Sequence, residues 1–255
     1  MSKNPVEVEL EKWPAFDWPS SVKTPRLLER ISFLEEHHRA NCRPYRRIAE
    51  GLSNETKVMA SMDQILALPV RMFKHIELRS CDQEKVVKTL LSSGTSGQAQ
   101  SKIFLDKETS AMQTRVLTKI MADFIGSKRL PMLVIDCQST VKDRTKFSAR
   151  TAGILGFSMF GRNTTFALTD ALKIDYDAID AFLEKYKESN ILVFGFTFIV
   201  WQHFLRELEK SGITLPLEKG VLIHGGGWKK LAHEAVEIEQ FKARSKAVSG
   251  ISRVH

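Results

Sequence analysis

Apolar residues in the second half of the chain form short runs that alternate with amphipathic stretches. Residues 132–135 and 191–194 are continuous apolar runs, typical of strands buried on both faces, and Gly195 is expected to end the second run. Shorter candidate strands lie at 166–168 and 221–223. Repeated strand, helix, strand order predicts an α/β fold, a mostly parallel sheet covered by helices and joined by right-handed crossovers.

Two segments between these strands have helical periodicity. Residues 176–187 place one apolar face on a helix, made of Ile179, Phe182, Leu183 and Tyr186. Residues 198–210 are expected to form another helix, because Gly212 follows them as a C-terminal glycine.

The first half of the chain predicts a helical segment with an extended beginning. The first twenty residues carry Trp13, Phe16 and Trp18 between prolines, which favours an extended strap. Helices are expected to begin at Pro25 and Pro44. The apolar stretch 62–73 is expected to be buried.

A further helix is expected from about Lys107, with Asp106 as its N-cap. Its apolar stripe, expected in the core, consists of Met112, Val116, Leu117, Ile120, Met121 and Phe124.

Composition restricts the class of protein. A chain of 255 residues with 43% hydrophobic composition can bury a substantial core, and no run of about 18 apolar residues predicts a transmembrane segment. The three cysteines are far apart, and the seven histidines are scattered, so neither a disulfide framework nor a zinc site is expected. The N-terminus lacks an apolar signal segment, which indicates a cytoplasmic protein.

The net charge of +8 raises the hypothesis of nucleic-acid binding. The densest basic clusters, around Arg43 and around Lys146, are not interleaved with aromatic residues for base stacking. A solvated basic face, or attraction of an anionic substrate, explains the charge better, and no nucleic-acid partner is expected. Arg150 suits either an anion or a surface ion pair.

The most informative segment is a loop of small residues at 92–97, Ser-Ser-Gly-Thr-Ser-Gly, followed by Lys102. Glycines allow backbone amides to converge on one anion, and the hydroxyls and the ammonium group add donors and charge. The alternative is a flexible polar turn, although the apolar segments 86–91 and 103–105 frame the loop closely. No Gly-Lys-Ser/Thr ends it, which argues against a kinase or GTPase.

This loop resembles the phosphate loop of acyl-adenylate-forming enzymes, and most of all that of the acyl-protein synthetases of the bacterial luciferase fatty-acid reductase system. Leu68-Pro69-Val70, Ser148-Ala149-Arg150 and Gly225-Gly226-Gly227-Trp228-Lys229 agree in order and spacing. The resemblance spans roughly residues 62–230, about two thirds of the chain. It implies a nucleotide-binding α/β domain at 62–255, like the N-terminal domain of these enzymes and incomplete at its C-terminus. Residues 1–61 are expected to form an extended and helical segment packed on this body.

The resemblance also implies a luminescence-related ligase. ATP and a fatty acid, or another carboxylic acid, would form an acyl-adenylate and pyrophosphate, and the acyl group would pass to a thiol. Lys102 and Thr95 are its expected catalytic residues, and Thr95 is also the expected contact to Mg²⁺. The expected ATP-binding residues are Ser92, Ser93, Gly94, Thr95, Ser96, Gly97, Lys102, Gly225, Gly226 and Gly227.

Some of these assignments have plain structural alternatives. The glycine run would line the adenosine pocket, or it would be a tight strand-to-helix turn. Phe196, Trp201 and Trp228 would wall an acyl slot, or they would be ordinary core aromatics.

The family's Tyr-Gly segment, its following glutamate and the acyl-accepting cysteine are expected beyond His255, so the chain is expected to lack the C-terminal part. Three alternatives stay open: a ligase using coenzyme A, a non-catalytic nucleotide- or acyl-binding module, and a basic nucleic-acid-binding protein. The missing part favours the second of these. An acyl-transferase and a reductase are the partner proteins that the resemblance implies, and the oligomeric state is left open.

Overall fold

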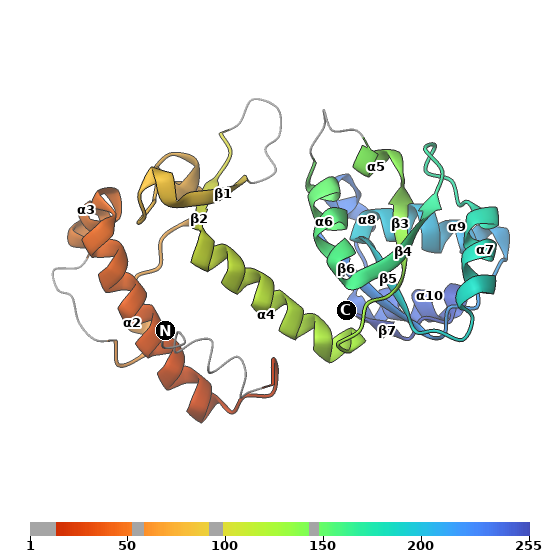
Figure 1. Cartoon of the computed structure of the whole chain (residues 1–255), viewed down its shortest axis with the longest axis horizontal. Helices are drawn as coiled ribbons and strands as arrows, with labels where there is room; N and C mark the ends of the chain where they lie inside the picture. The colour runs from red at the N-terminus through yellow and green to blue at the C-terminus, as the bar shows by residue number, and fades with distance from the viewer. Residues whose placement is uncertain (1–13, 53–58, 92–98, 143–147) are drawn as a thin grey trace. The chain divides into compact units, whose positions relative to one another are not determined.

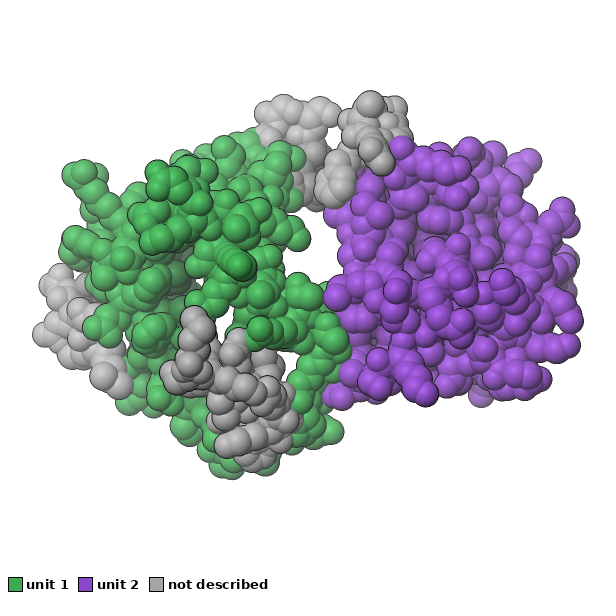
Figure 2. Space-filling model, viewed as in Figure 1, with its two compact units in different colours: residues 1–120 green, residues 121–255 purple. Residues whose placement is uncertain are grey.

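The computed structural model describes residues 14–52, 59–91, 99–142 and 148–255. The chain divides into two compact units, residues 1–120 and 121–255 (Figures 1 and 2). The expected division at residue 61 stays a prediction. Among the described residues, no helix combines the length and the apolarity that crossing a membrane requires.

The first unit begins with two helices, α2 (Ser20–Asn41) and α3 (Arg43–Leu52). Helix α2 starts before Pro25, not at it as the sequence suggested, and Pro25 lies inside the helix. Proline has no backbone N–H, so one hydrogen bond is missing inside the helix. A helix of 22 residues tolerates this loss. Helix α3 starts next to Pro44, as expected.

The rest of the first unit is a series of short turns and a hairpin. The 3₁₀ segments Met62–Gln64, Val70–Lys74 and Gln83–Lys85 precede two antiparallel strands, β1 (Val86–Leu91) and β2 (Lys102–Asp106). The expectation that 62–73 is buried was wrong: Val70 is 76% exposed, and no residue of the stretch is buried. Short 3₁₀ turns do not offer a continuous apolar face to a core.

Helix α4 (Lys107–Ile125) follows β2 and continues into the second unit. Its predicted cap is confirmed, because the backbone amide of Thr109 donates to Oδ1 of Asp106 over 2.7 Å. This bond is also the main reason that the pKa of Asp106 lies below its ordinary value. Of the expected core stripe, only Met121 is buried, and Met112, Val116 and Ile120 are half-buried.

The second unit contains a five-stranded parallel sheet in the order β4-β3-β5-β6-β7. The strands are β3 (Leu130–Cys137), β4 (Gly161–Leu168), β5 (Ile191–Phe196), β6 (Gly220–Gly225) and β7 (Arg253–Val254). Residues 131–137 of β3 are all buried, as expected for a parallel strand covered on both faces. The predicted α/β class with a mostly parallel sheet is confirmed.

Helices cover both faces of this sheet (Figure 1). The main core lies between one face and the helices α7 (Tyr176–Tyr186), α9 (Arg206–Ser211) and α10 (Ile238–Ser249). Helix α6 (Ala149–Phe157) covers the other face, where the Phe157 ring stacks on Phe194 at 4.4 Å. Val193 belongs to the main core and Phe194 contacts α6, because consecutive strand residues point to opposite faces.

Gly195 does not end β5, contrary to the sequence interpretation. It lies within the strand, in register with Ile135 of β3 and His224 of β6. A methyl group at this position would lie 2.6 Å from Cγ2 of Val200 and 3.0 Å from Cβ of Ile135. The glycine is therefore a packing requirement, not a stop signal.

The helix expected at 198–210 is interrupted by a different geometry. Helix α8 (Thr197–Ile199) leads into the π-helical segment η5 (Val200–Leu205), which continues as α9. It ends at Gly212 in the left-handed conformation, φ 68°, as predicted. π-Helical turns inside helices occur frequently at functional sites.

Candidate functional site at the carboxyl edge of the sheet

The strand order reverses between β3 and β5. The chain passes from β3 to β4 on one side and then returns across β3 to β5. In open α/β sheets, ligands bind outside the carboxyl ends of the strands at such a switch point. Three strands end together here: β3 in Asp136 and Cys137, β5 in Phe196, and β6 in His224 and Gly225. We call this region the carboxyl edge.

The glycine run after β6 is held from inside by Thr197. Its Oγ1 lies 2.8 Å from the carbonyl oxygen of Gly226, 3.1 Å from that of Gly225 and 2.9 Å from Nδ1 of His224. One hydroxyl hydrogen serves one acceptor, so the hydroxyl donates to a glycine carbonyl and accepts from an Nδ1–H. Burial lowers the pKa of His224, and the neutral ring with its hydrogen on Nδ1 can make this bond.

The three glycines of the run differ in their structural requirements. Gly226 has φ +81°, and a methyl group there would lie 3.0 Å from Cδ1 of Phe196. Gly225 and Gly227 are exposed, have no such φ and would place a methyl group in open space. The turn itself requires glycine at Gly226 alone. Glycine at the other two positions leaves backbone open to a close approach from outside.

The three expected substrate-binding aromatics divide into two groups. Phe196 is half-buried and packs between α6 and the glycine turn, since a methyl group at Gly153 would lie 2.7 Å from its Cζ. Trp201 is 3% exposed and contacts Trp228, with ring centroids 5.5 Å apart. Trp201 also stacks on Phe241, so it packs as a core residue. Phe196 also lies against the glycine run, because a methyl group at Gly226 would meet its ring.

A buried ion pair lies at the end of β3. Asp136 is 1% exposed and receives hydrogen bonds from Nε of Arg150 at 2.9 Å and from Nη2 of the same guanidinium. Its Oδ1 also accepts from the Thr140 hydroxyl and from the Cys137 amide, each over 2.7 Å. Arg150 stands in the first turn of α6, and its side chain is 28% exposed.

The pKa of His203, in η5, is lowered chiefly by burial, which a hydrogen bond with the Leu172 backbone and the charge of Glu207 oppose. The charges of Arg150 and Asp136 act on it more weakly. Sequence reasoning named neither Asp136, Thr197 nor His203 as site residues. Asp136 could have been found, because it directly follows the predicted strand 132–135 and so falls at a carboxyl end.

The remaining predicted site residues belong to the first unit. The loop residues Ser92–Gly97, including Thr95, lie outside the described residues. Lys102 is exposed at the start of β2, opposite Leu91 of β1, so it stands at the base of the strand pair from which this loop extends. Within the described residues, no group of three His, Cys, Asp or Glu side chains could hold a metal ion.

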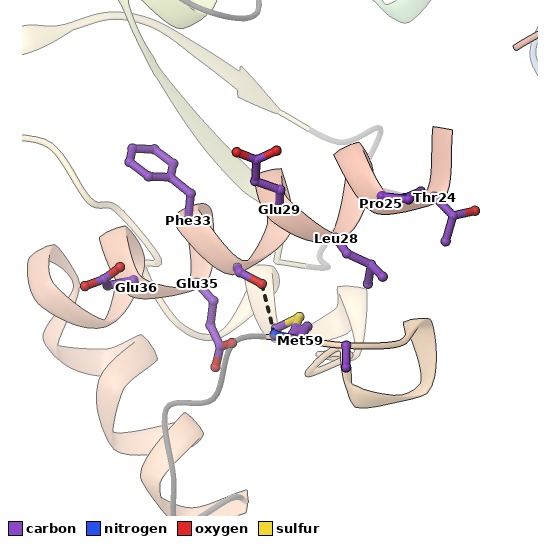
Figure 3. A pocket seen from close by; sticks show the side chains of 10 residues that line it. Thr24, Pro25, Leu28, Glu29, Phe33, Glu35, Glu36 and Met59 are labelled. Carbon is purple, nitrogen blue, oxygen red and sulfur yellow. Dashed lines mark hydrogen bonds between the residues drawn. The ribbon is translucent and has the colours of Figure 1, made fainter. Parts of the chain in front are cut away.

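A hollow of about 770 Å³ lies along α2 in the first unit (Figure 3). Leu28, Phe33 and Met59 contribute apolar surface, and the Met59 amide donates to Ser32 Oγ over 3.2 Å. The hollow also carries the carboxylates of Glu29, Glu35 and Glu36, of which Glu35 is paired with Arg39. Acidic side chains disfavour an anionic ligand, so the carboxyl edge is the better candidate for a phosphate or carboxylate substrate.

Comparison with known protein families matches residues 16–254 to the family described as acyl-protein synthetase, LuxE. The matched residues include β2 with Lys102 and the whole carboxyl edge of the second unit. No curated protein matches the chain.

Proposed function

Because the chain belongs to the LuxE family of acyl-protein synthetases, we propose that it activates a long-chain fatty acid with ATP and transfers the acyl group to a protein thiol. The observation that carries this proposal is the open backbone of Gly225 and Gly227, where the fold itself does not require glycine. The glycine run lies at the carboxyl end of β6, and open α/β sheets bind nucleotides at the carboxyl ends of their strands.

The proposed chemistry has two balanced steps. A carboxylate oxygen attacks the α-phosphorus of ATP, the bond to the bridging oxygen of the β-phosphate breaks, and pyrophosphate leaves. A thiolate sulfur then attacks the acyl carbon, and AMP leaves with the electrons of the broken carbon–oxygen bond. Both steps move negative charge onto phosphate oxygens, so fixed donors and cations are the catalytic groups that the chain must supply.

We assign these requirements to separate parts of the chain. The glycine run would hold the adenosine, and the hydroxyls and amides of Ser92–Gly97 would bind the phosphates together with Lys102. Mg²⁺ would be held mainly by the phosphates, with the Thr95 hydroxyl as a protein contact, since Mg²⁺ commonly keeps few protein ligands. Acyl-transferase and reductase proteins are the proposed partners.

The test is fatty-acid-dependent exchange of labelled pyrophosphate into ATP. Lys102→Ala should lower the exchange rate about tenfold or more, because it removes a cation from the leaving pyrophosphate. Lys88→Ala is the matched control, since Lys88 is also an exposed lysine, on the neighbouring strand β1. Absence of fatty-acid-dependent exchange in the unaltered chain would refute the proposal. An equal loss in both variants would remove Lys102 from the site.

The acceptor is tested separately. Release of AMP on addition of a cysteine-containing partner protein, and not on addition of coenzyme A, is the outcome that the family description favours. The opposite result would assign the chain to carboxylate–CoA ligation.

A further inference from the structure

We propose that Arg150 binds the carboxylate of the acyl substrate, and that buried Asp136 holds the guanidinium in place for it. This inference rests on the proposed function, because it names the group that receives the acid of that reaction. Asp136 lies at the end of β3, beside the switch point between β3 and β5, and Arg150 reaches it from the first turn of α6.

The hydrogen bonds of Asp136 leave it no role toward a ligand. Its two oxygens accept from the guanidinium, the Thr140 hydroxyl and the Cys137 amide, and the carboxylate is almost completely buried. A buried ion pair contributes little to stability compared with apolar residues of similar size. It does fix the orientation of the arginine, and a cation fixed in advance loses little entropy when it binds an anion.

Arg150 retains donors beyond those used by Asp136. Nε and Nη2 bond to the carboxylate, and Nη2 also lies 3.2 Å from the Thr140 hydroxyl. The hydrogen bonds of the guanidinium to Asp136 and Thr140 use Nε and Nη2, and the side chain, which also interacts with that of Cys137, is 28% exposed. Asp136 therefore uses one edge of the guanidinium, and Nη1 is the nitrogen that we assign to the oxyanion of the substrate.

An independent observation points to an amphiphilic acid instead of a polyphosphate. Gly153 and Phe157 follow Arg150 at three and seven residues along α6, so they lie near one line on the helix surface. The Phe196 ring lies against Gly153, and the Phe157 ring stacks on Phe194. A cationic group is thus followed along the helix by aromatic rings, of which Phe157 and Phe196 are half-buried, and this order matches a carboxylate head and an apolar chain.

The test measures discrimination between dodecanoate and dodecanol, which share a chain and differ in the head group. Calorimetric titration of the unaltered chain should give tighter binding of dodecanoate. Arg150→Gln should weaken dodecanoate binding roughly 10- to 100-fold and leave dodecanol binding unchanged, because a charge-assisted hydrogen bond is lost. Since Arg150→Gln leaves a buried charge unpaired, the double variant Asp136→Asn/Arg150→Gln is measured in parallel and should show the same loss of discrimination.

Arg206→Gln is the matched control. Arg206 is also ion-paired and partly exposed, but its partner is Glu234 and not Asp136. It should bind dodecanoate as the unaltered chain does. Equal loss in this control would show a general charge effect and overturn the inference. Equal affinity of the unaltered chain for acid and alcohol, or binding of neither, would also overturn it.

Measurements with ATP show whether Arg150 binds the carboxylate of the fatty acid or a phosphate of ATP. Arg150→Gln should raise the KM for fatty acid in pyrophosphate exchange and leave the KM for ATP unchanged. Weaker ATP binding with unchanged dodecanoate binding would assign Arg150 to a phosphate and overturn the inference. Acid-over-alcohol discrimination that depends on Arg150, without any exchange, would support the binding role and refute the proposed activity. Exchange with an unchanged KM for fatty acid in Arg150→Gln would support the proposed activity and refute the binding role of Arg150.

Discussion

The Thr197 hydroxyl at the end of β5 lies 2.8 Å from the carbonyl oxygen of Gly226, beyond the end of β6. This bond joins two neighbouring strands at their carboxyl ends, where the sheet ladder itself has stopped. It turns the Gly226 carbonyl inward, toward the protein. The shape of the glycine turn is thus set by a side chain 29 residues earlier in the chain.

Replacing Thr197 by Val tests this tie. The change keeps the shape of the side chain and removes the hydroxyl, so the Gly226 carbonyl and Nδ1 of His224 both lose their partner. We expect a loss of about 1–3 kcal/mol in the free energy of unfolding, measured by urea titration. Thr197→Ser keeps the hydroxyl and should lose less. Equal losses in the two variants would show that packing, not the hydrogen bond, is what matters.

Substitutions in the glycine run should affect folding at Gly226 and ATP binding at Gly225 and Gly227. Gly226→Ala should destabilise the protein by about 1–2 kcal/mol, because alanine is strained at φ +81° and its methyl group meets the Phe196 ring. Gly225→Ala and Gly227→Ala should change stability by less than about 0.5 kcal/mol, since open space surrounds both positions. These two should instead weaken ATP binding, measured by calorimetric titration. Unchanged ATP affinity in both would remove the run from the nucleotide site.

Local patterns predicted the elements whose structure is decided locally. The apolar run 132–135 is a buried strand, and the spacing of Ile179, Phe182, Leu183 and Tyr186 gives the buried face of α7. Gly195 was wrongly predicted to end β5, because the reason for a glycine at this position is not local. The atoms that exclude a side chain there belong to Val200 and Ile135, and only the folded register brings Ile135 beside it.

The candidate site could be predicted only in part, for a similar reason. A glycine run after a strand is visible in the sequence, and its place at the carboxyl end of β6 follows from the parallel topology. The pairing of Asp136 with Arg150 and of Thr197 with Gly226 joins residues from different elements, and residue spacing carries no such information. The loop at 92–97 lies outside the described residues, so its role stays a prediction.

His224 should make the protein sensitive to acid. Burial lowers its pKa below the ordinary value of 6.5, so the unfolded chain binds the proton more readily than the folded one. Its contribution to stability is therefore complete above pH 6.5 and is lost as the pH falls below that value toward the lowered pKa. His224→Gln should flatten the fall of the urea midpoint between pH 7.5 and pH 5.5. The exposed His233→Gln is the control, and an equal flattening there would contradict the assignment.

The Asp136–Arg150 pair should respond unequally to single and double changes. Arg150→Gln leaves a carboxylate that is 1% exposed without its counter-charge, and we expect a loss of about 3 kcal/mol in the free energy of unfolding. Adding Asp136→Asn removes that charge and keeps an acceptor for the Cys137 amide, so the double variant should recover at least half of the loss. Arg206→Gln should cost about 1 kcal/mol or less, because its partner Glu234 is 29% exposed and can be hydrated. A double variant less stable than Arg150→Gln would show that the buried charge is not the source of the cost, and the role of Asp136 in orienting the guanidinium would then need another physical basis.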